Sequence, residues 1–182
     1  MMAHFVCCSS QRNGLMQEIV KAFWQIALFR QGPDSLPVSR LLLYMAAGVY
    51  VFVDILVISI LYPRPAVMPL LLADTVLLVV WCVALLNLFG LQARLSQTLT
   101  ALFGTGALLQ VLGFPWSAWP SLGMPFEFPL VLRALILLAI LLWTVAVYGN
   151  IFARALERPL GIGVALALAY FLVIYQFAAR WA

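Results

Sequence analysis

Apolar residues dominate the chain after residue 40 and fall into five stretches separated by short segments rich in proline, arginine and glutamine. Each stretch has, or nearly has, the roughly 20 residues that a helix needs to cross the hydrocarbon core of a bilayer. The pattern therefore predicts a transmembrane domain over residues 41–178 that contains five spanning helices. Their predicted ranges are 41–62, 67–90, 98–114, 129–152 and 159–177. The third stretch is the shortest and contains Gly104 and Gly106.

The segment before these stretches has a different pattern. Projected on a helix, residues 14–30 place Gln17, Glu18, Lys21 and Gln25 on one face and apolar side chains on the rest. Such a segment is too polar on one side to span a bilayer, and we predict an amphipathic helix that lies in the membrane interface. The alternative is that it packs on one end of the bundle. Residues 1–13 show no periodicity and are predicted to form a disordered tail.

Composition supports a membrane protein of the all-α class, a polytopic helix bundle. The chain is 66% hydrophobic and 9% charged, with a mean hydropathy of +1.10. Soluble domains are about half apolar and about a quarter charged, so a water-soluble fold is excluded. The net charge of +4 does not indicate nucleic-acid binding, because the ten Lys and Arg residues are scattered singly. We expect the lipid bilayer to be the main partner, with no nucleic acid.

Most basic residues fall on one side of the predicted topology. The opposite side has Arg64 and Arg180, with Arg133 at its border. Because cytoplasmic loops are enriched in Lys and Arg, the amino terminus is predicted to be cytoplasmic and the carboxyl terminus external, in a bacterial inner membrane. The seven residues on the cytoplasmic side are Arg12, Lys21, Arg30, Arg40, Arg94, Arg154 and Arg158. On the external side, Trp116, Trp119, Phe126 and Phe128 are predicted to form an interfacial aromatic belt.

Two carboxylates interrupt the first two stretches, Asp54 and Asp74. A carboxylate at the centre of a spanning helix costs about 2.5–3.5 kcal/mol on insertion scales. It is therefore expected to face the bundle interior and to be paired, neutral or solvated through a cavity. At 1.5 Å per residue, Asp54 lies about 12 Å and Asp74 about 9 Å from the external ends of their helices. The two acids are thus predicted to lie at similar depth.

Other polar residues fall in the same half of the predicted bundle. Arg133 is four residues into the fourth span, Gln110 is near the external end of the third and Gln176 is near that of the fifth. We predict an intramembrane polar site formed by these three residues with Asp54 and Asp74. Three interpretations remain open: a proton- or cation-coupled site in a carrier or channel, a buried network that fixes helix pairing, or acids at a wet end without a role.

Small residues recur in the last predicted helix. Gly161, Ala165 and Ala169 are spaced four residues apart, with Gly163 and Ala167 beside them. Small residues at this spacing let two helices approach closely, which favours intramolecular helix packing or a homo-oligomer.

Motifs for catalysis and cofactor binding are lacking from the sequence. The one histidine, His4, lies in the predicted tail, and there is no HExxH, Cys/His cluster, P-loop or G-x-S-x-G. Three cysteines do not make a disulfide framework. We therefore expect neither enzymatic activity, nor a metal, nor a cofactor.

Two segments, QTLTALFGTGALLQVLGFP and LLWTVAVYGNIFARAL, follow an interfacial helix within a five-span pattern. With its span centred on Trp143 and its Gly/Ala-rich last helix, the chain resembles bacterial members of the Yip1 family over residues 20–178. The DLYGP-type and GYG-type sequences of eukaryotic members are absent. The resemblance implies a small polytopic protein that organises membranes or binds other membrane proteins, and it transfers no catalytic residues. That function is the leading expectation, and the coupled carrier is its rival.

Overall fold

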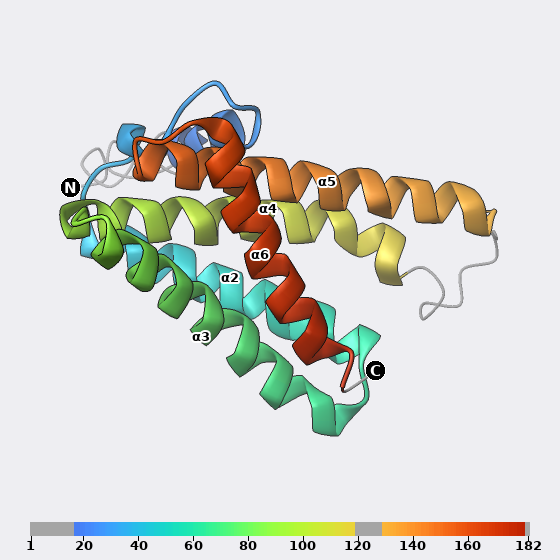
Figure 1. Ribbon diagram of the computed structural model, residues 1–182. Helices are drawn as coiled ribbons and strands as arrows, with labels where there is room; N and C mark the ends of the chain where they lie inside the picture. Colours follow the sequence, from blue (N-terminus) through green and yellow to red (C-terminus); the bar gives the residue numbers. More distant parts are fainter. Residues whose placement is uncertain (1–16, 119–128, 181–182) are drawn as a thin grey trace, which may run out of the picture.

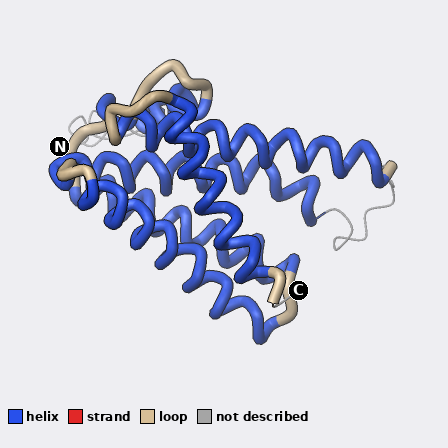
Figure 2. The backbone as a smooth tube through the Cα atoms, in the orientation of Figure 1, coloured by secondary structure: helices blue, strands red, loops and turns tan. Residues whose placement is uncertain are grey.

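The computed structural model describes residues 17–118 and 129–180, and in these residues it is an all-α helix bundle (Figures 1 and 2). Five helices are long and apolar enough to cross a membrane, which confirms the predicted fold class and a multi-pass membrane protein. They are α2 (Arg40–Leu61), α3 (Arg64–Leu88), α4 (Leu95–Ala118), α5 (Leu130–Ala155) and α6 (Leu160–Ala178). Of two short 3-10 helices, η1 (Pro33–Ser35) precedes α2 and η2 (Gln92–Arg94) lies between α3 and α4.

Local sequence signals set most helix ends. The Ser39 hydroxyl accepts a hydrogen bond from the Leu42 N–H at the start of α2 (3.4 Å). Pro63, Pro129 and Pro159 each precede a helix, where the missing N–H of proline costs nothing. Beyond the end of α3, Gly90 adopts a φ of 69°, a left-handed conformation that glycine tolerates best. The predicted breaks between spans therefore correspond to real helix ends.

The buried face of α2 is a narrow stripe. It repeats every fourth residue, so the stripe lies along one side of the helix while the remaining apolar residues face outward. This arrangement fits a helix that contacts the bundle on one side and lipid on the other. The stripe consists of Leu42, Ala46, Tyr50, Asp54 and Ile58.

Central in the bundle is α4, which contacts α2, α3 and α5. The prediction of residues 98–114 as a short third span is corrected, because α4 begins at Leu95 and continues through Pro115 to Ala118. Its lower hydropathy reflects burial against other helices, because every residue from Thr98 to Ala107 is buried. A buried central helix tolerates small and hydroxyl residues because it does not face lipid.

The threonines of α4 are satisfied within their own helix. Thr98 donates to the Arg94 carbonyl (2.9 Å), Thr100 to Ser96 (2.7 Å) and Thr105 to Ala101 (2.6 Å). Each hydroxyl shares a carbonyl four residues earlier, so no other helix is needed as a partner. The polar character of this stretch therefore carries little cost inside the bundle.

Replacing Thr105 with valine is expected to change the free energy of unfolding by less than about 1 kcal/mol, because the side-chain shape is kept and no partner loses its other hydrogen bond. Denaturant unfolding of the purified protein in detergent measures this change. A loss above about 2 kcal/mol would contradict the view that the hydroxyl acts only within α4.

The amino-terminal helix, residues 17–27 of the described chain, packs on one end of the bundle. Its Phe23 and Ile26 are buried, and the Phe23 ring fills the space where a side chain at Gly104 would lie. The indole N–H of Trp143 donates to the Ala27 carbonyl (2.9 Å). The alternative of packing on the bundle is thus observed. Its placement in a membrane interface stays a prediction, as does the disordered tail, which lies outside the described residues.

In space, α2 packs along α4, and α5 packs along α6. Figure 1 shows α6 crossing the bundle and ending near the α2–α3 connection, where Ala178 packs against a small buried cluster of α2 and α3 residues. In the same view, the far ends of α4 and α5 run together away from α2 and α3. Trp116 of the predicted aromatic belt lies within α4, and Trp119, Phe126 and Phe128 lie outside the described residues.

The close contact between α5 and α6 uses different small residues from those predicted. A Cβ on Gly163 would meet the Gly149 carbonyl oxygen and would lie 2.7 Å from the Ala153 nitrogen. Gly161 instead has nothing within 4 Å. Ala165 is exposed and Ala169 is only half-buried. The predicted packing face is therefore displaced: Gly163 faces α5 and Ala167 is buried, whereas Gly161 has open space around it.

Candidate functional site

Asp74, in the middle of α3, is held by tyrosines from two other helices. Tyr50 of α2 donates its hydroxyl to one carboxylate oxygen, and Tyr170 of α6 donates to the other (3.0 Å). Both tyrosine side chains are buried. Because a carboxylate accepts hydrogen bonds at both oxygens, these two hydroxyl groups satisfy it from two sides. Asp74 therefore joins α2, α3 and α6.

A third tyrosine completes this cluster. Tyr148 of α5 is buried, its ring centroid lies 6.2 Å from that of Tyr170, and its hydroxyl donates to the Leu102 carbonyl (3.5 Å). Gly106 of α4 makes room, because a Cβ there would lie 2.5 Å from the Tyr148 hydroxyl and 2.7 Å from the Tyr50 ring. Tyrosines from α2, α5 and α6 thus converge beside Asp74.

Asp54 lies one helical turn from Tyr50 on the same buried stripe, with a relative exposure of 5%. Its Oδ1 accepts a hydrogen bond from the Gln110 side-chain amide of α4 (3.3 Å). Its Oδ2 and the Gln110 Oε1 are buried without a hydrogen-bond partner. Asp54 and Gln110 are therefore brought together as predicted, but their hydrogen bonding is incomplete.

Two predicted members of the site lie elsewhere. Among the described residues, Arg94–Glu157 is the ion pair present, so Arg133 does not pair with either acid. Arg133 lies in the first turns of α5, at the end of that helix that runs away from α2 and α3 (Figure 1). Gln176 is exposed on α6. The predicted site of three charges is corrected to two acids, one glutamine and three tyrosines.

A cleft of about 320 Å³ opens beside this cluster. Asp74, the three tyrosines and Gln110 all line it. The rest of the lining comes from α2, α4, α5 and α6, and includes the aromatic side chains of Phe114 and Phe171. Among the described residues that line it, Asp74 is the one with a charge, and none is basic.

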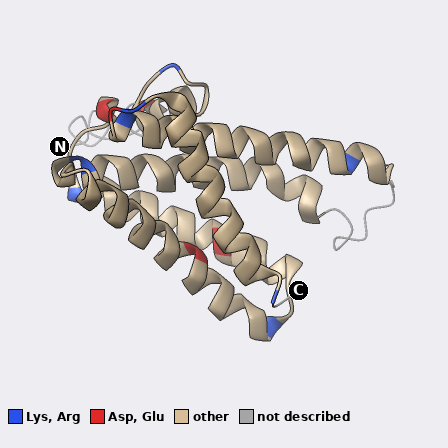
Figure 3. Cartoon of the chain, viewed as in Figure 1, with Lys and Arg blue, Asp and Glu red and all other residues tan. Residues whose placement is uncertain are grey.

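Acidic and basic residues occupy different parts of the molecule. Figure 3 shows acidic positions within α2 and α3, whereas most Arg residues of the described chain lie near helix ends or in connections. Within the described part of the chain, no three His, Cys, Asp or Glu residues gather closely enough to hold a metal ion. The cluster therefore presents negative charge and hydrogen-bonding groups without a basic partner.

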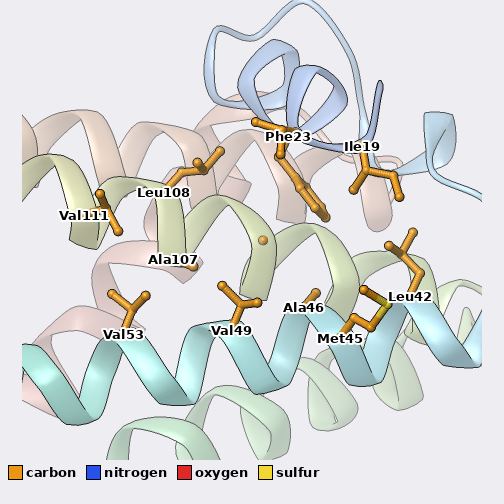
Figure 4. A pocket seen from close by; sticks show the side chains of 12 residues that line it. Ile19, Phe23, Leu42, Met45, Ala46, Val49, Val53, Ala107, Leu108 and Val111 are labelled. Carbon is orange, nitrogen blue, oxygen red and sulfur yellow. The ribbon is translucent and has the colours of Figure 1, made fainter. Parts of the chain in front are cut away.

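A second cavity is entirely apolar. It holds about 230 Å³ between the amino-terminal helix, α2 and α4. Figure 4 shows Ile19 and Phe23 directed toward it from the amino-terminal helix, with Met45 and Val49 on the α2 side and Leu108 on α4. Its lining has neither an acid nor a base, so its chemistry suits an apolar chain or side chain.

Sequence reasoning found the acids and Gln110 but missed the tyrosines. Tyr50 had a local signal, since it is four residues before Asp54 and thus on the same helix face. Tyr148 and Tyr170 had none, because they reach Asp74 only through the packing of α5 and α6 on the rest of the bundle.

Comparison of the chain with protein-family models, curated proteins and solved structures finds no match.

Proposed function

We propose that this protein is a small multi-pass carrier of the bacterial inner membrane that binds an organic cation in the tyrosine-lined cleft. The observation that carries this proposal is the combination of one carboxylate, Asp74, with five aromatic side chains around a single cleft. Those side chains are Tyr50, Phe114, Tyr148, Tyr170 and Phe171.

The chemistry of the cleft favours this class of ligand. A cation is attracted both by a carboxylate and by the faces of aromatic rings, most strongly where water is excluded. An anion lacks a partner, because no described lining residue is basic. Ca²⁺ and Mg²⁺ require about six or more oxygen ligands, and the largely apolar walls supply few. A cation with an apolar surface fits both the charge and the walls.

The excess of acids supports coupling to a second ion. Asp54 and Asp74 belong to one cluster without a basic partner among the described residues, and buried acids inside a membrane mark ion and proton pathways. With the amino terminus cytoplasmic, as the arginine distribution predicts, the cleft lies in the external half of the bundle. No residue is assigned a catalytic role in this proposal.

Purified protein is expected to bind tetraethylammonium saturably, and proteoliposomes are expected to take it up in response to a pH gradient. Equilibrium dialysis and radiolabel uptake measure the two effects. The matched control is Asp34→Asn, which removes an exposed carboxylate outside the cleft and should leave binding unchanged. Absence of saturable binding by folded wild-type protein would contradict the proposal.

A second candidate function is that of a membrane-organising factor that binds lipid or another membrane protein, as the Yip1-like pattern implies. It is favoured by the apolar groove under the amino-terminal helix (Figure 4). The tetraethylammonium binding experiment distinguishes the two candidate functions. Retention of a lipid or a second membrane protein through purification, without cation binding, favours the second.

A further inference from the structure

The two acids of the cluster differ in their hydrogen-bond partners. Asp74 accepts from two tyrosine hydroxyls, one at each oxygen. Asp54 accepts from one amide at Oδ1, and its Oδ2 has no partner. Of the two, Asp54 is also the more buried. The surroundings of Asp74 are those of an ionised carboxylate, whereas the surroundings of Asp54 are not.

Two buried oxygen atoms at this site have no hydrogen-bond partner, and both are acceptors. They are the Asp54 Oδ2 and the Gln110 Oε1, which belong to the two groups already joined by one hydrogen bond. An ionised carboxylate only accepts hydrogen bonds, and an amide oxygen only accepts them too. Two buried acceptors would therefore stay unsatisfied, at a cost of about 1–3 kcal/mol each.

A single proton on Asp54 would give both of these oxygen atoms a hydrogen bond. A protonated Oδ2 becomes a donor to the Gln110 Oε1, while the Gln110 amide continues to donate to Oδ1. The acid and the amide are then joined by two hydrogen bonds, and the buried carboxyl is neutral. Neutrality also avoids the cost of an isolated charge inside a membrane bundle.

We propose that Asp54 is a proton-binding site, in which a neutral carboxylic acid is paired with the side-chain amide of Gln110. Gln110 is the positioning residue, and because it also lines the cleft, it connects the proton site to the ligand site. The role of this proton as the coupling ion rests on the proposed carrier function, whereas the protonation itself does not.

The titratable groups around Asp54 support this assignment. Tyr50 lies on the same helix, Asp74 on α3, Tyr148 on α5 and Tyr170 on α6, and α4 contributes the uncharged Gln110. Asp74 is close enough to act electrostatically on Asp54. No Lys or Arg in the described chain pairs with either acid. Two ionised carboxylates in one cluster would repel each other, so a proton on Asp54 avoids two negative charges side by side.

Infrared spectroscopy tests this proposal directly, because a protonated carboxyl group has a carbonyl band distinct from that of a carboxylate. The chain has three aspartates, Asp34, Asp54 and Asp74, so labelling aspartate with carboxyl ¹³C limits the signal to them. At neutral pH the protein is expected to show a protonated aspartate band that survives in Asp34→Asn and Asp74→Asn. The band should be lost in Asp54→Asn, which keeps the fold because an amide pair preserves both hydrogen bonds.

A second variant covers the case in which Asp54→Asn does not fold. Gln110→Leu removes the amide partner, so the protonated band is expected to shift to higher frequency, which a merely structural role for Gln110 would not produce. A spectrum with no protonated aspartate at neutral pH, or a band that disappears in Asp74→Asn and remains in Asp54→Asn, would overturn the proposal. A band assigned to Asp54 without tetraethylammonium binding would leave the proton site standing and reject the carrier function.

Discussion

Replacing Asp74 with asparagine is expected to weaken tetraethylammonium binding at least about tenfold, equivalent to 1.4 kcal/mol. Asparagine has nearly the same shape and its oxygen still accepts a hydrogen bond from one tyrosine, so the fold should persist. What is lost is the carboxylate that lines the cleft, which no other described lining residue supplies. Equilibrium dialysis of the folded variant beside wild type measures the loss.

Two further variants serve as comparisons for Asp74→Asn. Asp34→Asn removes an exposed charge outside the cleft and should bind as wild type does. Tyr170→Phe keeps the ring but removes a hydroxyl that donates to Asp74, so a smaller loss is expected. An Asp74→Asn protein that is folded and binds with unchanged affinity would show that the cleft carboxylate does not hold the cation.

Replacing Gly163 with valine is expected to destabilise the protein by about 3 kcal/mol or more, toward the upper end of the cost of overpacking. Backbone atoms of α5 occupy the space that a side chain at Gly163 would need, and backbone cannot move aside as a flexible side chain does. The two helices would have to separate, which would also displace Tyr170 from Asp74. Unfolding in detergent, followed by circular dichroism, measures the effect.

The same helix provides a matched control for this variant. Gly161→Val introduces the same side chain two residues earlier, where nothing lies within 4 Å. It should leave the stability of the monomer within about 0.5 kcal/mol of wild type, as is usual for exposed positions. Equal destabilisation by the two variants would contradict the packing of α5 on α6. A change in oligomeric state in Gly161→Val alone would instead identify the outward face as a homo-oligomer contact.

The incomplete hydrogen bonding at Asp54 distinguishes among the interpretations that the sequence left open. Burial of Asp54 argues against acids at a wet end of the bundle. A network that only fixes helix pairing is expected to be fully hydrogen-bonded, because each unsatisfied buried atom weakens it. Asp74 meets that condition, whereas Asp54 and Gln110 leave two buried acceptors unpaired. This difference is the reason for assigning a proton to Asp54.

Most of the fold was predictable from the sequence, and the one helix that was predicted poorly has a physical explanation. Proline positions and the lengths of the apolar stretches predicted five helices, with most ends within a few residues of those observed. The exception was α4, whose length was underestimated at both ends. Hydropathy measures suitability for lipid, and α4 is surrounded largely by protein. Hydropathy therefore underestimated the length of the helix at the centre of the bundle.

The sequence by itself determined the membrane-spanning helix bundle and the presence of two acids within apolar helices, because length, hydropathy and the cost of charge in lipid are properties of single segments. It also placed Asp54, Asp74 and Gln110 at compatible depth. Only the tertiary structure decided which groups meet them. The tyrosines beside Asp74, the separation of Arg133 from both acids and the use of Gly163 in place of Gly161 depend on how each helix is rotated and tilted against its neighbours. Those angles follow from packing among several helices, which no single segment encodes.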